Sequence, residues 1–246
     1  MTFRQGVWTI VLSLLAGMLV MLWAPVARAE VLDKTKDVGG TTVHYKVVLP
    51  NGYDPAKTYP AVFAFPPGSQ TMELVNEVLE KNYRDQAERR GYILVIPAAP
   101  NGDMFFEEGQ RIFPAFFEAI LHDFKIEGGK FHAAGMSNGG ISAFYIAALY
   151  PQDFLSITGF PGYLPDAAPA SVHAITHMCI NMYVGGLDSD WLGVVQPQAS
   201  QFRAEGLRVR FAVEPGQPHI IGTLRGDGAA RLFDGFDEAR RGCGGR

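Results

Sequence analysis

Apolar positions recur along this chain with two different periods, and segments of the two kinds follow one another in turn. Short runs that alternate or are continuously apolar, bounded by Pro, Gly and Asn, are typical of β-strands. Longer segments with apolar residues three and four positions apart are typical of helices. We expect strands at 43–49, 59–65, 92–96, 130–134, 155–160, 179–184 and 209–213, and helices at 73–90, at 114–124, at 141–150, and within 191–204 and 222–241.

The order of these elements predicts the fold class. Strands that alternate with helices form a mostly parallel sheet with helices on both faces. The run at 59–65 is apolar at most positions, as expected for a strand that is buried on both faces. No repeat, low-complexity tract or long linker divides the chain. The sequence therefore predicts an α/β fold in a single domain.

The first 29 residues follow neither pattern. Residues 6–24 are almost wholly apolar, a basic residue precedes them, and the Ala-Arg-Ala sequence at 27–29 is typical of a cleavage site. We expect a signal peptide over 1–29, cleaved after Ala29, and one domain over 30–246 that is periplasmic or secreted. The apolar run is longer than in most signal peptides, so an uncleaved membrane anchor is the alternative.

Composition and charge exclude some classes of function. The chain of 246 residues is 48% hydrophobic and 19% charged, with a formal net charge of −4. Removing the first 29 residues leaves 19 basic against 25 acidic side chains. This mildly acidic balance is unlike a nucleic-acid-binding surface, and the apolar content is unlike a disordered chain. We expect a globular enzyme with no nucleic-acid partner, and with no membrane contact after signal cleavage.

One short motif dominates the candidate chemistry. Residues 135–140, Gly-Met-Ser-Asn-Gly-Gly, lie between the expected strand at 130–134 and the expected helix at 141–150. G-x-S-x-G in this context is typical of a sharp turn that exposes the serine hydroxyl. Side chains at 135 and 139 would collide with the neighbouring strand and helix. We predict that Ser137 is a nucleophile; the alternative is a Gly-rich turn that opens a helix.

A nucleophilic serine needs a base, and the base needs an acid that orients it. On this kind of sheet the chain order is Ser, acid, His. His219 follows the last expected strand, so we predict that it is the base. Asp188 and Asp190 both follow the strand at 179–184; Asp188 is better placed, Asp190 is the alternative acid, and either could simply form the turn. The other histidines are expected to be packing or surface residues: His44, His122, His132, His173 and His177.

Two backbone amides should bind the negative charge that develops on the substrate. One is the amide of Asn138, the residue after the nucleophile. The other should come from the turn after 59–65, where Pro66 and Pro67 have no N–H group. That leaves Gly68 or Ser69 as the second donor of an oxyanion hole.

Together these residues resemble the α/β-hydrolase superfamily, and within it the extracellular esterases that include polyhydroxybutyrate depolymerases, feruloyl esterases and acetylxylan esterases. The resemblance spans roughly 43–236 and rests on the motif at 135–140, Gly-Gly-Leu-Asp at 185–188 and the strand and turn at 61–70. It implies the α/β-hydrolase fold and a secreted serine hydrolase that splits small or polymeric carboxylic esters through an acyl-serine intermediate, without a metal or a cofactor. The chain departs from the family at Pro66-Pro67, where His-Gly is usual.

Two further expectations follow. The exposed-looking run Met104-Phe105-Phe106 and Trp191 are candidates for lining an apolar acyl site, with ordinary loop packing as the alternative. The implied fold also brings Cys179 and Cys243 to the sheet edge that lies away from the site. In an exported protein such a pair is expected to form a disulfide, with two separate thiols as the alternative.

Other functions are compatible with the same fold. A hydrolase-shaped binding protein, defective at Pro66-Pro67, is one alternative, although the retained Ser, Asp and His argue against it. Acyl transfer or peptide hydrolysis by the same residues is another.

Overall fold

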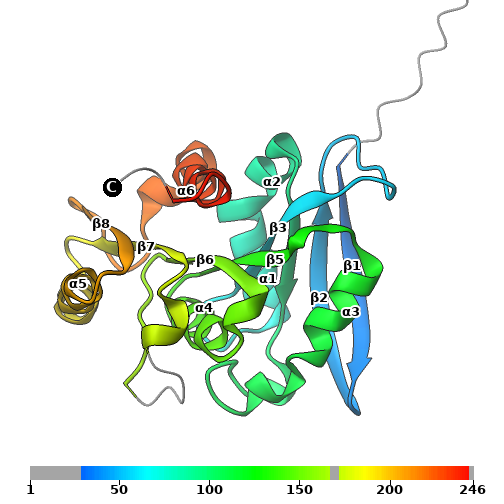
Figure 1. Ribbon diagram of the computed structural model, residues 1–246, viewed down its shortest axis with the longest axis horizontal. Helices are drawn as coiled ribbons and strands as arrows, with labels where there is room; N and C mark the ends of the chain where they lie inside the picture. Colours follow the sequence, from blue (N-terminus) through cyan, green and yellow to red (C-terminus); the bar gives the residue numbers. More distant parts are fainter. Residues whose placement is uncertain (1–28, 167–171, 244–246) are drawn as a thin grey trace, which may run out of the picture.

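Eight strands form a central sheet in the order β1-β2-β4-β3-β5-β6-β7-β8 (Figure 1). The structure is a computed structural model and describes residues 29–166 and 172–243. The strands are β1 (Glu30–Val38), β2 (Thr41–Leu49), β3 (Tyr59–Phe65), β4 (Ile93–Pro97), β5 (Ile126–Gly135), β6 (Phe154–Gly159), β7 (Cys179–Gly185) and β8 (Arg208–Glu214).

The sheet is parallel except at one edge. β3 pairs in parallel with β4 and β5, and parallel pairing continues through β6, β7 and β8. β1 and β2 are antiparallel to each other, and β2 is antiparallel to β4. The carboxyl ends of parallel strands all lie along one side of the sheet, which we call its carboxyl edge, so the segments that follow these strands gather there. This edge receives Gly68 after β3, Ser137 after β5, Asp188 after β7 and His219 after β8.

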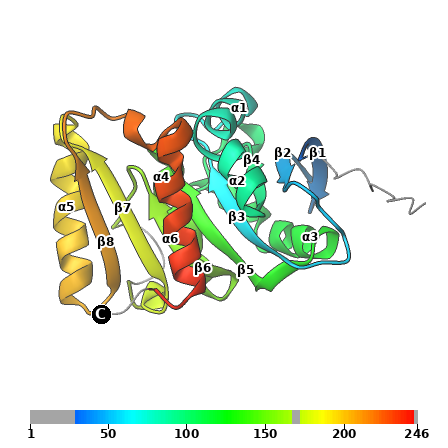
Figure 2. The same ribbon diagram turned by 90° about the horizontal axis from the view of Figure 1, so that it is seen from above.

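In the described part of the chain, six α-helices cover the two faces of the sheet, as Figure 2 shows from above. Along β3, Phe63 and Phe65 face one apolar core, whereas Val62 and Ala64 face the other, because successive strand residues point to opposite sides. The first core packs under α3 (Ala115–Asp123), α4 (Asn138–Leu149) and α5 (Ser189–Ala204), and the second under α1 (Met72–Val78), α2 (Arg84–Arg90) and α6 (Ala230–Arg240).

β1 was not predicted from the sequence. This strand forms a hairpin with β2 through Gly39 and Gly40, whose φ angles are 60° and 84°. β1 lies at the edge of the sheet, and most of its side chains are polar and exposed or half-buried. Charged edge strands discourage pairing with other chains, but they lack the apolar alternation by which a strand is recognised in a sequence.

The helix expected at 73–90 is interrupted. A π-helical turn, Leu79–Tyr83, separates α1 from α2. The wider turn buries Asn82 and Tyr83, and the Asn82 amide donates a hydrogen bond to the Leu224 carbonyl at 2.9 Å. The turn therefore joins this helical segment to the loop before α6, a contact 142 residues away in the chain.

The remaining expected elements are present with shifted ends. α4 begins at Asn138 and not at 141, and α5 begins at Ser189 and contains Pro197 within it. The last helix, α6, lies within 222–241 as expected, and 3₁₀ turns occupy residues 222–224 and 226–229 before it begins. The loop at 97–109, which follows β4, contains short 3₁₀ turns, Pro100–Gly102 and the start of Glu108–Ile112.

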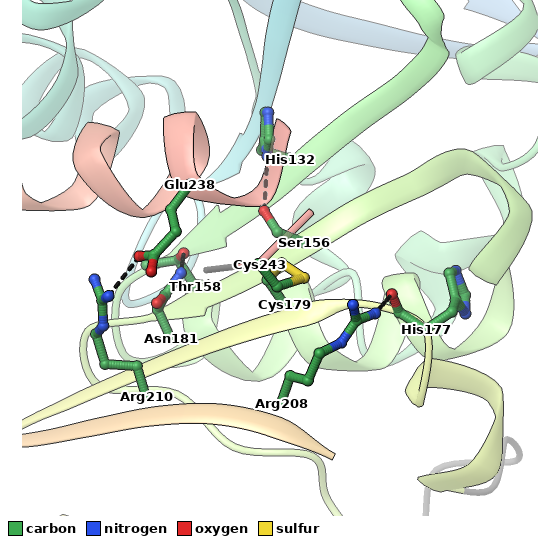
Figure 3. Close-up of a disulfide and its surroundings, with 10 residues drawn as sticks. All are labelled: His132, Ser156, Thr158, His177, Cys179, Asn181, Arg208, Arg210, Glu238 and Cys243. Carbon is green, nitrogen blue, oxygen red and sulfur yellow. Dashed lines mark hydrogen bonds and ion pairs between the residues drawn. A yellow bond between two sulfur atoms is a disulfide. The ribbon is translucent and has the colours of Figure 1, made fainter. Parts of the chain in front are cut away.

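A disulfide joins Cys179, the first residue of β7, to Cys243, just beyond α6 (Figure 3). The Cα atoms lie 5.5 Å apart and the residues are 64 positions apart. α6 runs back from the carboxyl edge of the sheet, so the bond lies at the opposite edge from Ser137. In the chain-entropy model a loop of this length contributes about 4 kcal/mol to stability.

Most of the expected signal peptide lies outside the described residues, so signal cleavage and export remain predictions. Within 29–166 and 172–243, no helix is both long enough and apolar enough to cross a membrane.

Candidate active site

Ser137 occupies a strained turn between β5 and α4. Its φ and ψ angles are 59° and −124°, a region that residues other than glycine seldom adopt. A Cβ atom on Gly135 would lie 2.1 Å from the Gly139 carbonyl oxygen, and one on Gly139 would lie 2.1 Å from the Phe65 carbonyl oxygen. Only glycine lets β5, α4 and the end of β3 approach this closely, and the half-buried Ser137 hydroxyl is left at the surface.

Three side chains from three loops form a continuous hydrogen-bonded chain. The Nε2 atom of His219 lies 2.9 Å from the Oγ atom of Ser137, and its Nδ1 atom lies 2.7 Å from the Oδ2 atom of Asp188. With the Nδ1 proton donated to the carboxylate, Nε2 can accept the serine proton. The geometry therefore matches that of a serine with an attached base and an orienting acid.

Asp190 takes a different position. It lies in the first turn of α5, where a carboxylate interacts favourably with the helix dipole, and its Oδ1 atom is 3.5 Å from the Ser189 hydroxyl. The structure thus brings Asp188, and not Asp190, to His219.

The loops that carry the acid and the histidine are packed backbone to backbone. The Leu187 amide donates to the Gln217 carbonyl at 2.9 Å, and the Gly186 amide donates to the Glu214 carbonyl at 2.8 Å. A Cβ atom on Gly185 would lie 2.2 Å from the Pro218 carbonyl oxygen. These contacts set the distance between the Asp188 and His219 side chains.

An ion pair that was not predicted from the sequence anchors the histidine loop; its carboxylate is buried and its guanidinium is exposed. Glu214, at the end of β8, accepts hydrogen bonds from Arg231 at 2.6 and 2.8 Å and from the Thr223 hydroxyl at 2.8 Å. The bonded Arg231 guanidinium holds the pKa of Glu214 below its usual value. No local motif marks this pair, because its members come together only when α6 packs on the sheet.

The turn after β3 lies against the nucleophile loop. The Asn138 side-chain amide donates to the Gly68 carbonyl at 2.9 Å and contacts the Met104 sulfur at 3.3 Å. The φ angle of Gly68 is 57°. As the first residue of α4, Asn138 has a backbone amide with no partner inside the helix. Gly68, Ser69 and Asn138 are therefore neighbours in space.

Gln70 holds this turn in place, a role that was also not predicted from the sequence. Its side chain is fully buried and its φ angle is 55°. Its amide nitrogen donates to the Ser142 hydroxyl at 2.8 Å and to the Pro66 carbonyl at 3.2 Å, and its amide oxygen accepts from the Phe105 amide at 3.0 Å. One side chain thus ties the turn to α4 and to the loop at 97–109.

We expect Gln70→Leu to lower the free energy of unfolding by about 2–4 kcal/mol, because it leaves the buried Phe105 amide and Pro66 carbonyl without partners. Urea unfolding measures this. The same change at exposed Gln152 should stay within about 0.5 kcal/mol. Equal effects at both positions would show that the Gln70 hydrogen bonds contribute no stability.

Of the residues expected to line an apolar acyl site, some lie beside the site and one lies in the core. Phe105, which looked exposed in the sequence, is buried in the core against Phe65 and Phe113, so for it the packing alternative holds. Met104 contacts Asn138 beside the nucleophile. Trp191 lies next to the histidine, with its ring centroid 5.1 Å from that of His219.

Among the described residues, no histidine other than His219 is hydrogen-bonded to Ser137. His132 is buried in β5, where its Nδ1 atom is 2.7 Å from the Ser156 hydroxyl (Figure 3). Burial lowers the pKa of His132 to about 3, so its ring is neutral. His177 contacts the Pro151 carbonyl, and His122 lies beside Asp123. Among the described residues no three His, Cys, Asp or Glu side chains are arranged to hold a metal ion.

Comparison with known proteins adds structural likeness only. No family model matches the chain, and no curated protein is significantly similar to it. Among solved structures, a thermostable esterase matches with a TM-score of 0.66 and 14% identity over 86% of this chain and 62% of that one. A mutant feruloyl esterase module from Clostridium thermocellum, complexed with sinapinate, also matches with a TM-score of 0.66 and 14% identity, over 85% of this chain and 87% of that one.

A third structure, an S-formylglutathione hydrolase from Agrobacterium tumefaciens, matches with a TM-score of 0.64 and 15% identity over 88% of this chain and 95% of that one. The described sheet, its helices and these likenesses show that the chain has the α/β-hydrolase fold, as the sequence predicted. At such identities the likeness extends to the fold and not to the reaction.

Proposed function

We propose that this protein is an exported serine hydrolase that cleaves carboxylic esters through an acyl-serine intermediate. The observation that carries the proposal is the hydrogen-bonded chain from Asp188 through His219 to Ser137, at the carboxyl edge of an α/β-hydrolase sheet. The apolar segment and cleavage sequence at 1–29 support export.

Each of the three groups has one role in this mechanism. Ser137 Oγ attacks the ester carbonyl carbon while His219 Nε2 takes its proton, and Asp188 stabilises the imidazolium that forms. The tetrahedral intermediate collapses, the bond to the alcohol oxygen breaks, and His219 returns the proton to that oxygen. Water, activated by His219, then hydrolyses the acyl-serine.

The oxyanion is held by the backbone amides of Asn138 and, we infer, Gly68 in preference to Ser69. The Gly68 carbonyl accepts a hydrogen bond from the Asn138 side chain. In a trans peptide the carbonyl and the following amide point in opposite directions, so the Ser69 amide points away from Asn138. Pro66 and Pro67 supply no donor, and the Pro66 carbonyl is bonded to Gln70.

Labelling with a fluorophosphonate probe, read by intact mass and peptide mapping, tests the proposal. We expect one adduct, on Ser137, and no adduct in His219→Ala, because the serine then has no base. A folded protein that takes up no probe would contradict the proposal and favour the binding-protein alternative. Product analysis with an added alcohol, and a panel of amides, would distinguish hydrolysis of esters from acyl transfer and from peptide hydrolysis.

A further inference from the structure

We propose that the alcohol half of the ester is apolar and binds a surface that we call the apolar rim: Tyr163, Leu187, Trp191, Val194 and Ile220. The inference rests on the proposed function and specifies its substrate class. Its starting point is the path of the proton. The leaving oxygen must lie within hydrogen-bond reach of His219 Nε2 to be protonated, so the alcohol half extends over the His219 side of the site.

Two aromatic rings line that side. The Trp191 ring centroid lies 5.1 Å from the His219 ring and 5.4 Å from the Tyr163 ring. Tyr163 is held near the nucleophile, because the Pro161 carbonyl, two residues earlier, accepts a hydrogen bond from the Ser137 amide at 2.9 Å. The rings therefore connect the loop beside Ser137 to the histidine.

The position of these rings is supported by hydrogen bonds outside the site. The Gln198 side chain, on α5, accepts from the Leu164 amide at 2.8 Å and donates to the Leu164 carbonyl at 2.6 Å. This pairing fixes the loop that carries Tyr163 against the helix that carries Trp191. The aromatic part of the rim is thus built before a substrate binds.

Exposed aliphatic side chains extend the aromatic pair. Leu187 is 70% exposed and precedes Asp188, Ile220 is 46% exposed and follows His219, and Val194 is 44% exposed on α5. Trp191 and Val194 are three residues apart on α5, so they lie on one side of that helix, and Leu187 lies in the turn just before it. Leu187, Val194 and Ile220 are three of the four large hydrophobic side chains that are exposed among the described residues. Their position beside one site indicates a binding surface.

The opposite flank has a different chemistry. A groove of about 540 Å³ begins at Ser69 and runs to the turn between β1 and β2. It carries no Lys, Arg, Asp or Glu side chain, and its polar members are hydroxyl, amide and imidazole groups, including Thr42 and Thr71. The groove also has the apolar residues Met72, Ala98, Ala99 and Pro100 in its lining, so it offers mixed contacts, whereas the rim on the His219 side, the side of the alcohol, is aromatic and aliphatic.

Two matched series of esters test the inference. One series joins acetate to straight-chain alcohols from ethanol to octanol, and the other joins ethanol to acids from acetate to octanoate. We expect kcat/KM to rise about twofold per methylene in the alcohol series, about half of the free energy of full burial, and to rise less in the acyl series. The rise in kcat/KM should come mainly from a fall in KM, with kcat nearly constant along the series.

Variants assign the effect to the rim. Trp191→Ala and, separately, Leu187→Ser should flatten the alcohol series; the Leu187 side chain is mostly in solvent, so its variant is expected to fold. Thr42→Ala, in the groove on the opposite flank, should leave the slope unchanged. A flat alcohol series, a steeper acyl series, or a slope that survives both rim variants would overturn the inference while Ser137 still takes up the fluorophosphonate probe. If no ester is hydrolysed and the probe does not react, the proposed function fails and the inference fails with it.

Discussion

Ser137→Ala is expected to lower kcat for simple aryl esters by at least about 10⁴-fold. Alanine cannot form the acyl-enzyme, and what remains is the stabilisation that the oxyanion amides give to attack by water. Steady-state hydrolysis by the purified variant measures the loss. Because the nucleophile, base and acid act as a unit, adding His219→Ala to this variant should cost little more.

The control for this change is a serine with no part in the proposed mechanism. Ser200→Ala, on the exposed side of α5, should retain wild-type turnover. Thermal unfolding of Ser137→Ala should differ little from that of the wild type, because within residues 29–166 and 172–243 the Ser137 side chain is hydrogen-bonded to His219 alone. Turnover above about 10% of wild type in a homogeneous preparation would remove Ser137 from the mechanism.

The second large effect concerns stability at low pH. His132 is neutral in the folded protein because burial lowers its pKa to about 3; the positive charge of Arg240 acts in the same direction and Asp237 opposes it. In the unfolded chain its pKa is near 6.5. Between these two pKa values the unfolded state binds a proton at His132 that the folded state does not bind. The contribution of His132 to the free energy of unfolding is therefore fully present above pH 6.5 and decreases as the pH falls below it.

Protonation of this histidine in the unfolded chain should lower the free energy of unfolding by about 1.4 kcal/mol for each pH unit below 6.5, or by about 2 kcal/mol between pH 7.5 and pH 5. Urea unfolding at both pH values, with the disulfide intact, measures the difference. His132→Asn should be less stable at pH 7.5 but should lose this part of the pH dependence, whereas exposed His122→Asn should keep it. If His132→Asn and the wild type lose stability equally, His132 is not held neutral.

The parts of this fold that could be predicted from sequence are those with a local signature. The buried strand at 59–65 and the glycines around Ser137 are recognisable because burial and close backbone approach restrict the residue types at those positions. Chain order then pointed to His219, and the structure places that residue beside Ser137.

The parts that could not be predicted depend on contacts between distant residues. β1 is an exposed, charged edge strand, so it lacks an apolar pattern. Gln70 and Glu214 are ordinary polar residues until the chain folds, when each becomes a buried side chain at the centre of a hydrogen-bond network. The choice between Asp188 and Asp190 depends on how the loop after β7 turns into α5, which the spacing of two aspartates does not determine.

The disulfide divides the proposed machinery into two parts. The covalent ring closed by Cys179 and Cys243 contains β7, α5, β8 and α6, and therefore both Asp188 and His219, whereas Ser137 lies outside it. Cys243 follows Ser137, Asp188 and His219 in the chain, so the ring can close only after all three residues have been synthesised, and its closure needs an oxidising environment. Before that step, the same chain would hold its nucleophile beside partners secured by non-covalent contacts alone.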